Sequence, residues 1–315
     1  MKKFTFVFIR IFLICTFFLL STVTEVFAYE TVFPYVFTDS LGKKIIINEK
    51  PETVVSLMGS YAETWTLAGG AVLGVTVDAV KERNMNLPDN VRIIGSVKAP
   101  NLEQILNLEP DLVILSSDID GHLKAIPILE NSGITCAAFK VEGFLDYLEM
   151  LEVFTNITGR EDLYLKNGLA VQIKINEIIS KVKNSDKKPS VLFLRAFSTG
   201  IKAKGSDNLT GMILKDIGAD NIVSKHASML ESLSMETIIM EDPDYIFIVA
   251  MGEESDKTLE SLYKEFRSNP AWSNLSAIKN DYFFILPKEL FHYKPNARWG
   301  ESYEYLAKII YPQLF

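Results

Sequence analysis

The sequence predicts an α/β protein built from two similar lobes with mostly parallel sheets, joined by one long helical connector. One observation behind this prediction is an internal repeat, because residues 101–117 (NLEQILNLEPDLVILSS) align without a gap on residues 234–250 (SMETIIMEDPDYIFIVA). Each copy has a helix-capping residue, apolar residues at helical spacing, a proline that ends the helix, and an apolar run typical of a buried strand. A second observation is that strands and helices alternate on both sides of a proline-free, helix-forming stretch at residues 143–183.

The N-terminal lobe is expected at residues 29–142. It opens with two strands around Leu41-Gly42, which is a hairpin signal. A β-branched run at residues 53–57 then turns into a helix at 61–68, which Gly69-Gly70 ends as a C-cap. The further elements follow in order: strands at 72–77 and 91–94, the first copy of the repeat, a helix at 122–130 and a strand at 134–139.

The helical connector is expected at residues 143–188, bent near Gly159 and followed by a polar turn. The C-terminal lobe, residues 189–315, starts with a strand at 191–194 and repeats the alternation of strand and helix. A last amphipathic helix at about 297–310 closes the chain, with these apolar residues along one side: Trp299, Tyr303, Leu306 and Ile310.

Residues 1–28 have the pattern of a secretory signal peptide. Lys2 and Lys3 form a basic start, residues 11–20 are almost wholly apolar, and Val26-Phe27-Ala28 resembles a small-residue cleavage site. Arg10 interrupts the apolar stretch, which leaves it short of the ~20 residues that a membrane span needs. We therefore expect a cleaved leader and an exported protein.

The remaining chain is acidic. Without Lys2, Lys3, Arg10 and Glu25 it has 29 basic and 39 acidic residues, a net charge of about −10. Such a charge argues against nucleic acid as a partner. Only Cys136 remains after the leader, so we expect no intramolecular disulfide and a buried thiol.

Several short motifs in a fixed order carry a resemblance to a known family. The sequence resembles the class III substrate-binding proteins of ABC importers, whose members carry ferric siderophores, haem or cobalamin. The likeness covers nearly all of the chain after the leader. It depends on these stretches: Lys50-Pro51-Glu52-Thr53-Val54-Val55-Ser56-Leu57, Ile94-Gly95, Pro100-Asn101-Leu102-Glu103, Pro110-Asp111-Leu112-Val113-Ile114, Lys204-Gly205-Ser206, Asn269-Pro270-Ala271-Trp272 and Lys294-Pro295-Asn296-Ala297-Arg298.

The resemblance implies two Rossmann-like lobes with the ligand held in the cleft between them. It implies a carrier that captures an iron complex such as a ferric siderophore, with haem or cobalamin as the alternative ligands. The implied partners are an ABC permease dimer and its ATPase. We expect a monomer without a cofactor of its own, in the periplasm or on the outer face of the cytoplasmic membrane, with iron entering only as part of the bound chelate.

Glu103 and Glu236 occupy matched positions in the two copies of the repeat. A carboxylate in the first turn of a helix stabilises the exposed N–H groups by ~0.3–1 kcal/mol, which is one explanation for both residues. In the family that this sequence resembles, one exposed Glu per lobe pairs with arginines of the permease. We expect both residues to serve in permease docking.

The candidate ligand-binding residues follow from a rule of doubly wound lobes, in which ligands lie beyond the carboxyl ends of the strands. Aromatic rings together with several cations suit a flat or greasy anionic ligand. Tyr61 packed in the core and lysines on the solvated face of a hairpin are the alternatives. The candidates are Ser60, Tyr61, Asp118, Arg195, Phe197, Lys204, Met251, His292, Tyr293 and Lys294.

Direct binding of a bare metal ion is not expected. His122, His226 and His292 lie far apart, and the sequence has no HxH, CxxC or HExxH pattern. His292 or Tyr293 as an axial ligand to haem iron stays open as an alternative.

Two other classes of protein remain as alternatives. An exported α/β hydrolase would have G-x-S-x-G at a strand-to-helix turn, and residues 58–62 (MGSYA) lack both outer glycines. A surface interaction module would have no deep cleft between lobes. The sequence carries no catalytic signature, and we predict that the protein is not an enzyme.

Overall fold

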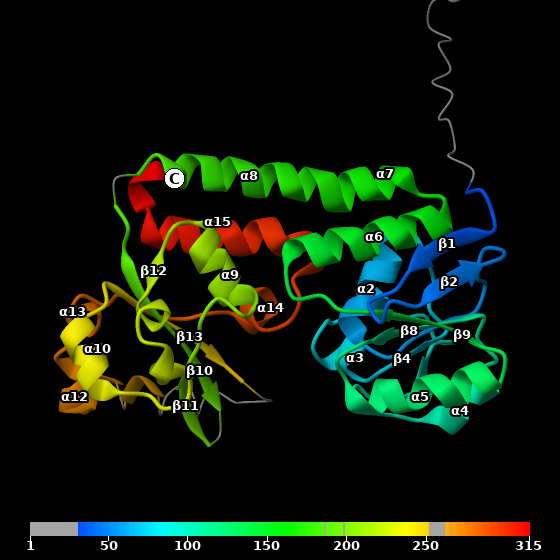
Figure 1. The fold of residues 1–315 in the computed structure, drawn as a ribbon, viewed down its shortest axis with the longest axis horizontal. Coiled ribbons are helices and arrows are strands. Elements are labelled where there is room, and N and C mark those ends of the chain that lie inside the picture. The colour runs from blue at the N-terminus through cyan, green and yellow to red at the C-terminus, as the bar shows by residue number, and fades with distance from the viewer. Residues whose placement is uncertain (1–30, 186, 198, 252–261, 265) are drawn as a thin grey trace, which may run out of the picture. The chain divides into compact units, whose positions relative to one another are not determined.

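The computed structural model describes residues 31–185, 187–197, 199–251, 262–264 and 266–315 (Figure 1). The expected signal peptide, residues 1–28, lies outside this part. No helix in the described ranges is long and apolar enough to cross a membrane.

The N-terminal lobe is built on a five-stranded sheet in the order β5-β4-β3-β8-β9, with every neighbouring pair parallel. Its strands are β3 (Val54–Ser56), β4 (Gly74–Val75), β5 (Arg92–Ile93), β8 (Leu112–Ser116) and β9 (Thr135–Phe139). The predicted strands at 72–77 and 91–94 are therefore present but only two residues long.

Both faces of this sheet are covered, which explains the unbroken apolar runs in its sequence. Side chains alternate between the faces, so Val54 packs with Tyr61 of α2 (Gly59–Leu67) and with α6 (Phe144–Thr158). The next residue, Val55, packs on the opposite face with Ile105 of α4 (Leu102–Asn107) and with α5 (Asp120–Asn131). Cys136 packs in the same core as Val55 and Ile105, and burial raises the pKa of its thiol to about 12.

The C-terminal lobe has a second five-stranded sheet, in the order β11-β10-β13-β14 with β12 also paired to β10. The pairs of β10 with β12 and β13, and of β13 with β14, are parallel, while β10 and β11 form an antiparallel hairpin. The strands are β10 (Ser190–Phe197), β11 (Gly200–Ala203), β12 (Asp220–Asn221), β13 (Tyr245–Ala250) and β14 (Phe283–Ile285). The prediction of an α/β fold with mostly parallel sheets is confirmed.

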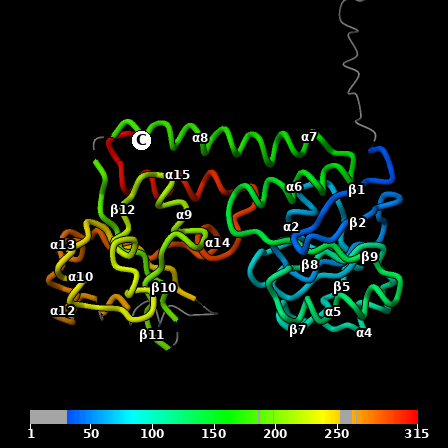
Figure 2. Tube along the Cα trace, in the orientation of Figure 1, coloured from blue at the N-terminus to red at the C-terminus, as the bar shows by residue number. Residues whose placement is uncertain are grey.

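The segment between the two sheets is helical, as expected. After α6 the chain bends at Gly159, whose φ of 73° is in the left-handed region that glycine tolerates. It continues through α7 (Glu161–Tyr164), a π-helical turn (Leu165–Leu169) and α8 (Ala170–Lys183). The closing helix α15 (Trp299–Ile310) packs beside α8 (Figures 1 and 2) and buries the predicted apolar side.

The repeat recognised in the sequence appears as the same unit in both lobes. Asn101 caps α4 by accepting a hydrogen bond from the main-chain N–H of Gln104, and Ser234 caps α10 (Met235–Glu241) through Thr237. Each unit continues into a strand of the sheet, β8 or β13.

An aspartate at the start of each repeated strand holds the start of the neighbouring strand. The Asp111 carboxylate accepts main-chain hydrogen bonds from Glu52 at 2.9 Å and Thr53 at 2.8 Å, just before β3. The Asp244 carboxylate accepts from the N–H and the hydroxyl of Ser190, at 2.8 and 3.0 Å, at the start of β10. Burial pushes the pKa of Asp111 up, but the hydrogen bonds from Thr53 and Glu52 outweigh it and hold this pKa below its ordinary value of 3.8. We call these two aspartates the strand clamps.

The remaining elements are short. They are the predicted hairpin β1 (Tyr35–Thr38) and β2 (Lys44–Ile47), the pair β6 (Gly95–Ser96) and β7 (Ala99–Pro100), the helices α3 (Asp78–Lys81), α9 (Leu209–Asp216), α12 (Pro270–Ser273), α13 (Ser276–Lys279) and α14 (Lys288–Phe291), and the 3-10 turns Ile222–Ser224, Ala227–Leu230, Asn296–Arg298 and Pro312–Leu314.

Candidate functional site

A cleft lies where residues that follow strands of both lobes come together. One part has a volume of about 820 Å³ and is lined by residues 81–84 of the N-terminal lobe and 285–289 of the C-terminal lobe, with Glu63, Ala250, Tyr293, Arg298 and Tyr305. A second part of about 680 Å³ is lined by Val77, Asp78, Ser96, Val97, Lys98 and His292, and shares with the first Lys81, Glu82, Lys288 and Tyr293. The shared residues make these parts one cleft, and its size suits a small-molecule ligand.

Basic side chains enter this cleft from both lobes. Lys81 and Lys98 come from the segments that follow β4 and β6, and Lys288 from the start of α14. Lys81 and Lys98 are exposed, while Lys288 is half-buried. Carboxylates of Glu82 and Glu289 also line the cleft, so its charge is mixed.

His292 marks the point where the positive charges converge. Its pKa falls from 6.5 to about 4, first because the ring is buried and then because Arg195, Lys288 and Lys294 place positive charges nearby. The imidazole is therefore neutral at neutral pH. Of these three cations, Lys288 lines the cleft, while Arg195 and Lys294 lie behind His292 and add positive charge to this side of it, which suits an anionic group.

Arg195 and Lys294 are held beside this point by the fold. Burial lowers the pKa of Arg195, and its Nε has no hydrogen-bond partner among the described residues. Burial also lowers the pKa of Lys294, whose ammonium group donates a hydrogen bond to the main-chain oxygen of Val141 at 2.5 Å. Lys294 therefore ties the C-terminal segment to the N-terminal lobe.

Two of the predicted ligand-binding residues lie in the interior. Tyr61 is fully buried in the core and donates its hydroxyl to the main-chain oxygen of Phe139 at 3.0 Å, and burial raises its pKa. Ser60 is buried in the first turn of α2. The structure thus places Tyr61 in the core, which is the alternative that the sequence left open for it.

The other predicted residues lie at strand ends. Phe197 is half-buried at the end of β10, Met251 packs against the core after β13, and Lys204 directly follows β11. Asp118 is exposed and accepts a hydrogen bond from the Ser116 hydroxyl. Of all the predicted residues, His292 and Tyr293 line the cleft, and Arg195 and Lys294 lie beside His292.

Sequence reasoning missed the three lysines that line the cleft, Lys81, Lys98 and Lys288. Lys81 and Lys288 follow β4 and β14, so the same strand-end rule could have found them. It also missed Glu63 and Arg83, whose helix and loop positions give no such signal.

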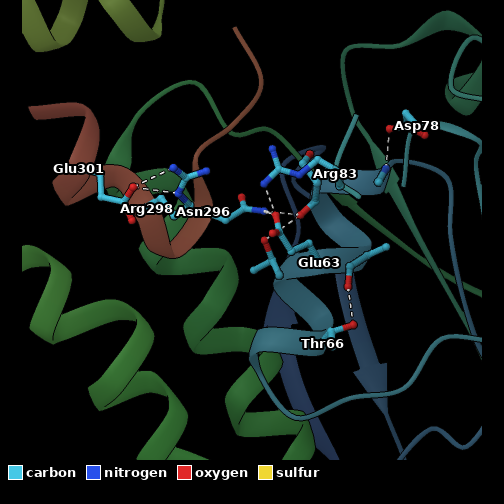
Figure 3. Close-up of polar contacts among 11 residues, drawn as sticks. Glu63, Thr66, Asp78, Arg83, Asn296, Arg298 and Glu301 are labelled. Carbon is cyan, nitrogen blue, oxygen red and sulfur yellow. Dashed lines mark hydrogen bonds and ion pairs between the residues drawn. The ribbon is translucent and has the colours of Figure 1, made fainter. Parts of the chain in front are cut away.

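Glu63 is the centre of a polar network at the edge of the cleft (Figure 3). Its carboxylate forms an ion pair with Arg83 and accepts a hydrogen bond from the side-chain amide of Asn296 at 2.5 Å. The same amide also donates to the main-chain oxygen of Ser60 at 2.9 Å. Arg298, on the next turn, is paired with Glu301 instead. The network joins α2 and the loop after α3 to the C-terminal segment.

The two predicted docking residues lie on the surface. Glu103 and Glu236 are exposed, and each is in the first turn of its helix, α4 or α10. Their side chains are available to a partner, and their role in docking stays a prediction.

The described residues contain no group of three or more His, Cys, Asp or Glu side chains that could hold a metal ion. His122 is fully buried, accepts from the N–H of Ser116 at 2.9 Å and lies 2.7 Å from the Val97 oxygen, a structural role. His226 is paired with Glu241 at 2.7 Å.

Residues 54–290 match the periplasmic binding protein family, and the chain belongs to this family. It is 28% identical over 244 residues to the Fe(3+)-citrate-binding protein YfmC of Bacillus subtilis, covering 75% of this chain and 73% of that protein. It is 22% identical over 225 residues to the high-affinity heme uptake system protein IsdE of Staphylococcus aureus, covering 69% and 74%. The crystal structure of Staphylococcus aureus SirA complexed with staphyloferrin B has the same fold, with a TM-score of 0.66 and 19% identity, covering 89% of this chain and 98% of that one.

Family membership defines the class of the protein. It is the substrate-binding component of an ABC importer, as the sequence predicted, and not an enzyme. The exported hydrolase and the surface interaction module do not fit this family. Its members bind small iron-containing ligands, work with ABC permeases, and act outside the cytoplasm, either free in the periplasm or anchored to the membrane.

Proposed function

We propose that this protein captures an iron(III) chelate with peripheral negative charges in the cleft and delivers it to an ABC permease. The observation that carries this proposal is that the basic side chains of Lys81, Lys98 and Lys288 line the cleft from both lobes. A carboxylate-bearing chelate such as a ferric citrate complex would place its anionic groups against these cations. The relative named for Fe(3+)-citrate binding supports this ligand class.

Haem is the second candidate ligand. The neutral imidazole of His292 could coordinate iron, and the ring of Tyr293 lines the cleft beside it. The relative named for heme uptake supports this candidate. Haem propionates would use the same cations as the carboxylates of a chelate, so the cations alone do not separate the two ligands.

We propose that Glu103 and Glu236 dock the loaded protein on an ABC permease dimer with its ATPase. Both are exposed at matched positions of the repeat, one in each lobe. The protein then acts as a monomer, exported by the leader at residues 1–28 to the periplasm or the outer face of the cytoplasmic membrane. It needs no cofactor of its own.

Titration of the purified protein with ferric citrate, a ferric hydroxamate, haemin and cyanocobalamin tests the ligand class. The tryptophans are Trp65, Trp272 and Trp299, and a bound iron chelate or porphyrin quenches their emission by energy transfer. We expect saturable quenching by an anionic ferric chelate, weakened as ionic strength rises. Preference for haemin with a Soret shift would select the second candidate, and no saturable response to any ligand would contradict both.

A further inference from the structure

The network around Glu63 brings together three pieces of chain that build the walls of the cleft. Glu63 belongs to α2, Arg83 to the loop after α3, and Asn296 to the segment between α14 and α15. We propose that Glu63 is a positioning residue that braces the two walls of the cleft against each other before ligand arrives. The expected effect on ligand affinity rests on the proposed function, while the expected effect on the spacing of the two lobes does not.

On the C-terminal side, the brace holds a strained and buried residue. Asn296 is 1% exposed and has a φ of 52°, in the left-handed region that non-glycine residues rarely adopt. The NH2 group of its side-chain amide donates to the oxygens of both Ser60 and Glu63. Tyr293 and Arg298, which flank it, line the cleft. Fixing Asn296 to α2 therefore fixes the wall that these two residues form.

On the N-terminal side, the brace holds the loop that follows α3. The Arg83 side chain is 7% exposed and pairs with a Glu63 side chain that is 29% exposed. Removing one partner of such a sheltered pair leaves the other charge poorly compensated, which is more costly than the loss of a surface pair. Lys81 and Glu82, which lie directly before Arg83, line both parts of the cleft. Their position depends on where Arg83 is held.

Removal of the Glu63 carboxylate should change ligand affinity in opposite directions under two interpretations of its role. As a charge on the cleft wall, the Glu63 carboxylate repels an anionic ligand, so its removal would strengthen binding. As a brace, it keeps the walls at a fixed spacing, so its removal reduces the fraction of molecules that are ready to bind. If that fraction falls to about a tenth, the apparent Kd rises about tenfold.

The test compares Glu63→Gln with Glu289→Gln. Glu289 lines the same part of the cleft and is exposed, and its removal takes away one negative charge without touching Asn296 or Arg83. With ferric citrate as the probe, we expect about tenfold weaker binding for Glu63→Gln and slightly tighter binding for Glu289→Gln. Tighter binding by both variants, or weaker binding by both, would overturn the proposal.

Spin labels give a measurement that does not require a ligand. Cysteines introduced at Lys124 on α5 and Lys279 on α13, both exposed, place one label in each lobe, and the native Cys136 is buried with a pKa of about 12, so it stays unlabelled. We expect the distance distribution between the labels to broaden in Glu63→Gln and to narrow again with saturating ferric citrate. An unchanged ligand-free distribution contradicts the brace, whatever the ligand.

A second variant covers the case in which Glu63→Gln does not fold. Asn296→Gly keeps the left-handed backbone that glycine accepts and removes the side chain, with its hydrogen bonds to Glu63 and to the main-chain oxygen of Ser60. It should broaden the distance distribution like Glu63→Gln, and the double variant should broaden it by less than the sum of the two single variants, because both changes weaken the contact between Asn296 and Glu63. Additive broadening would show that the two residues act separately and would contradict the proposal. If the wild type binds no ferric chelate, the proposed function fails. The distances between the labels without ligand still test whether Glu63 holds the two walls at a fixed spacing.

Discussion

Replacing Arg195 by alanine should weaken the binding of an anionic ferric chelate at least tenfold. Arg195 is one of the three cations around His292, and its Nε has no hydrogen-bond partner among the described residues. A hydrogen bond between charged groups contributes about 1.5–3 kcal/mol. Because the guanidinium is only partly buried, we take the low end, and about 1.4 kcal/mol corresponds to a factor of ten in Kd.

The pH dependence of the variant gives a second, more specific signature. In the wild type His292 is neutral above its pKa of about 4, which burial and the nearby cations hold below 6.5. Removing Arg195 takes away one of these cations, so the pKa of His292 should rise toward 6.5. Lowering the pH from about 7 to about 5 then protonates a larger fraction of His292 in the variant than in the wild type and restores part of the lost positive charge. The ratio of the Kd of Arg195→Ala to the Kd of the wild type should therefore be smaller at about pH 5 than at about pH 7.

Fluorescence titrations of both proteins at the two pH values measure this effect, and the ratio of their Kd values cancels changes in the ligand itself. Lys202→Ala is the matched control, since Lys202 lies opposite Arg195 on β11 and is exposed. An Arg195→Ala curve that coincides with the wild type would refute the placement of Arg195 at the ligand. Equal losses for the two variants would show a general charge effect instead.

Other predictions test the docking surface and the fold. Glu103→Arg and Glu236→Arg should each abolish uptake in cells and leave the Kd unchanged, and a lost affinity would remove them from the docking surface. Asp111→Ala and Asp244→Ala should each lower the free energy of unfolding by about 1 kcal/mol, because the freed N–H groups can turn to water, and the double variant should be additive. Because the pKa of Asp111 is lowered in the folded protein, its contribution to the free energy of unfolding is present at neutral pH and is lost progressively as the pH falls from 3.8 through this lowered pKa. Denaturant unfolding should therefore show a smaller Asp111→Ala deficit at about pH 2.5 than at pH 7. Gly121→Ala would place a Cβ 2.2 Å from a main-chain oxygen and should cost about 2 kcal/mol or more, as thermal unfolding would show, and an unaltered Tm would contradict this packing.

The architecture was predictable because it depends on patterns that repeat along the chain. The apolar runs at β8 and β13 and the caps Asn101 and Ser234 are local signals, and the structure contains both units. The bend at Gly159 was also a local signal. The short strands β4 and β5 were less well defined, since two paired residues leave little periodicity to recognise.

The site was only partly predictable, because a cleft is made by residues that are distant in sequence. The strand-end rule found His292 and Tyr293 but also selected Tyr61, which follows β3 in the first turn of α2 and whose ring is buried in the core. The rule says where a chain segment emerges and not which way a side chain points. The contact between Asn296 and Glu63 joins positions 233 residues apart, so no local pattern could predict it.

The strand clamps have a consequence for how the ligand specificity of this protein can evolve. Asp111 and Asp244 fasten the edge of each sheet at which the central strands begin, while the ligand cleft is built at the edge where they finish. The bonds that hold each lobe in register therefore share no residue with the surface that selects the cargo. A lineage can exchange the side chains around His292 and acquire a new cargo while its two sheets stay intact.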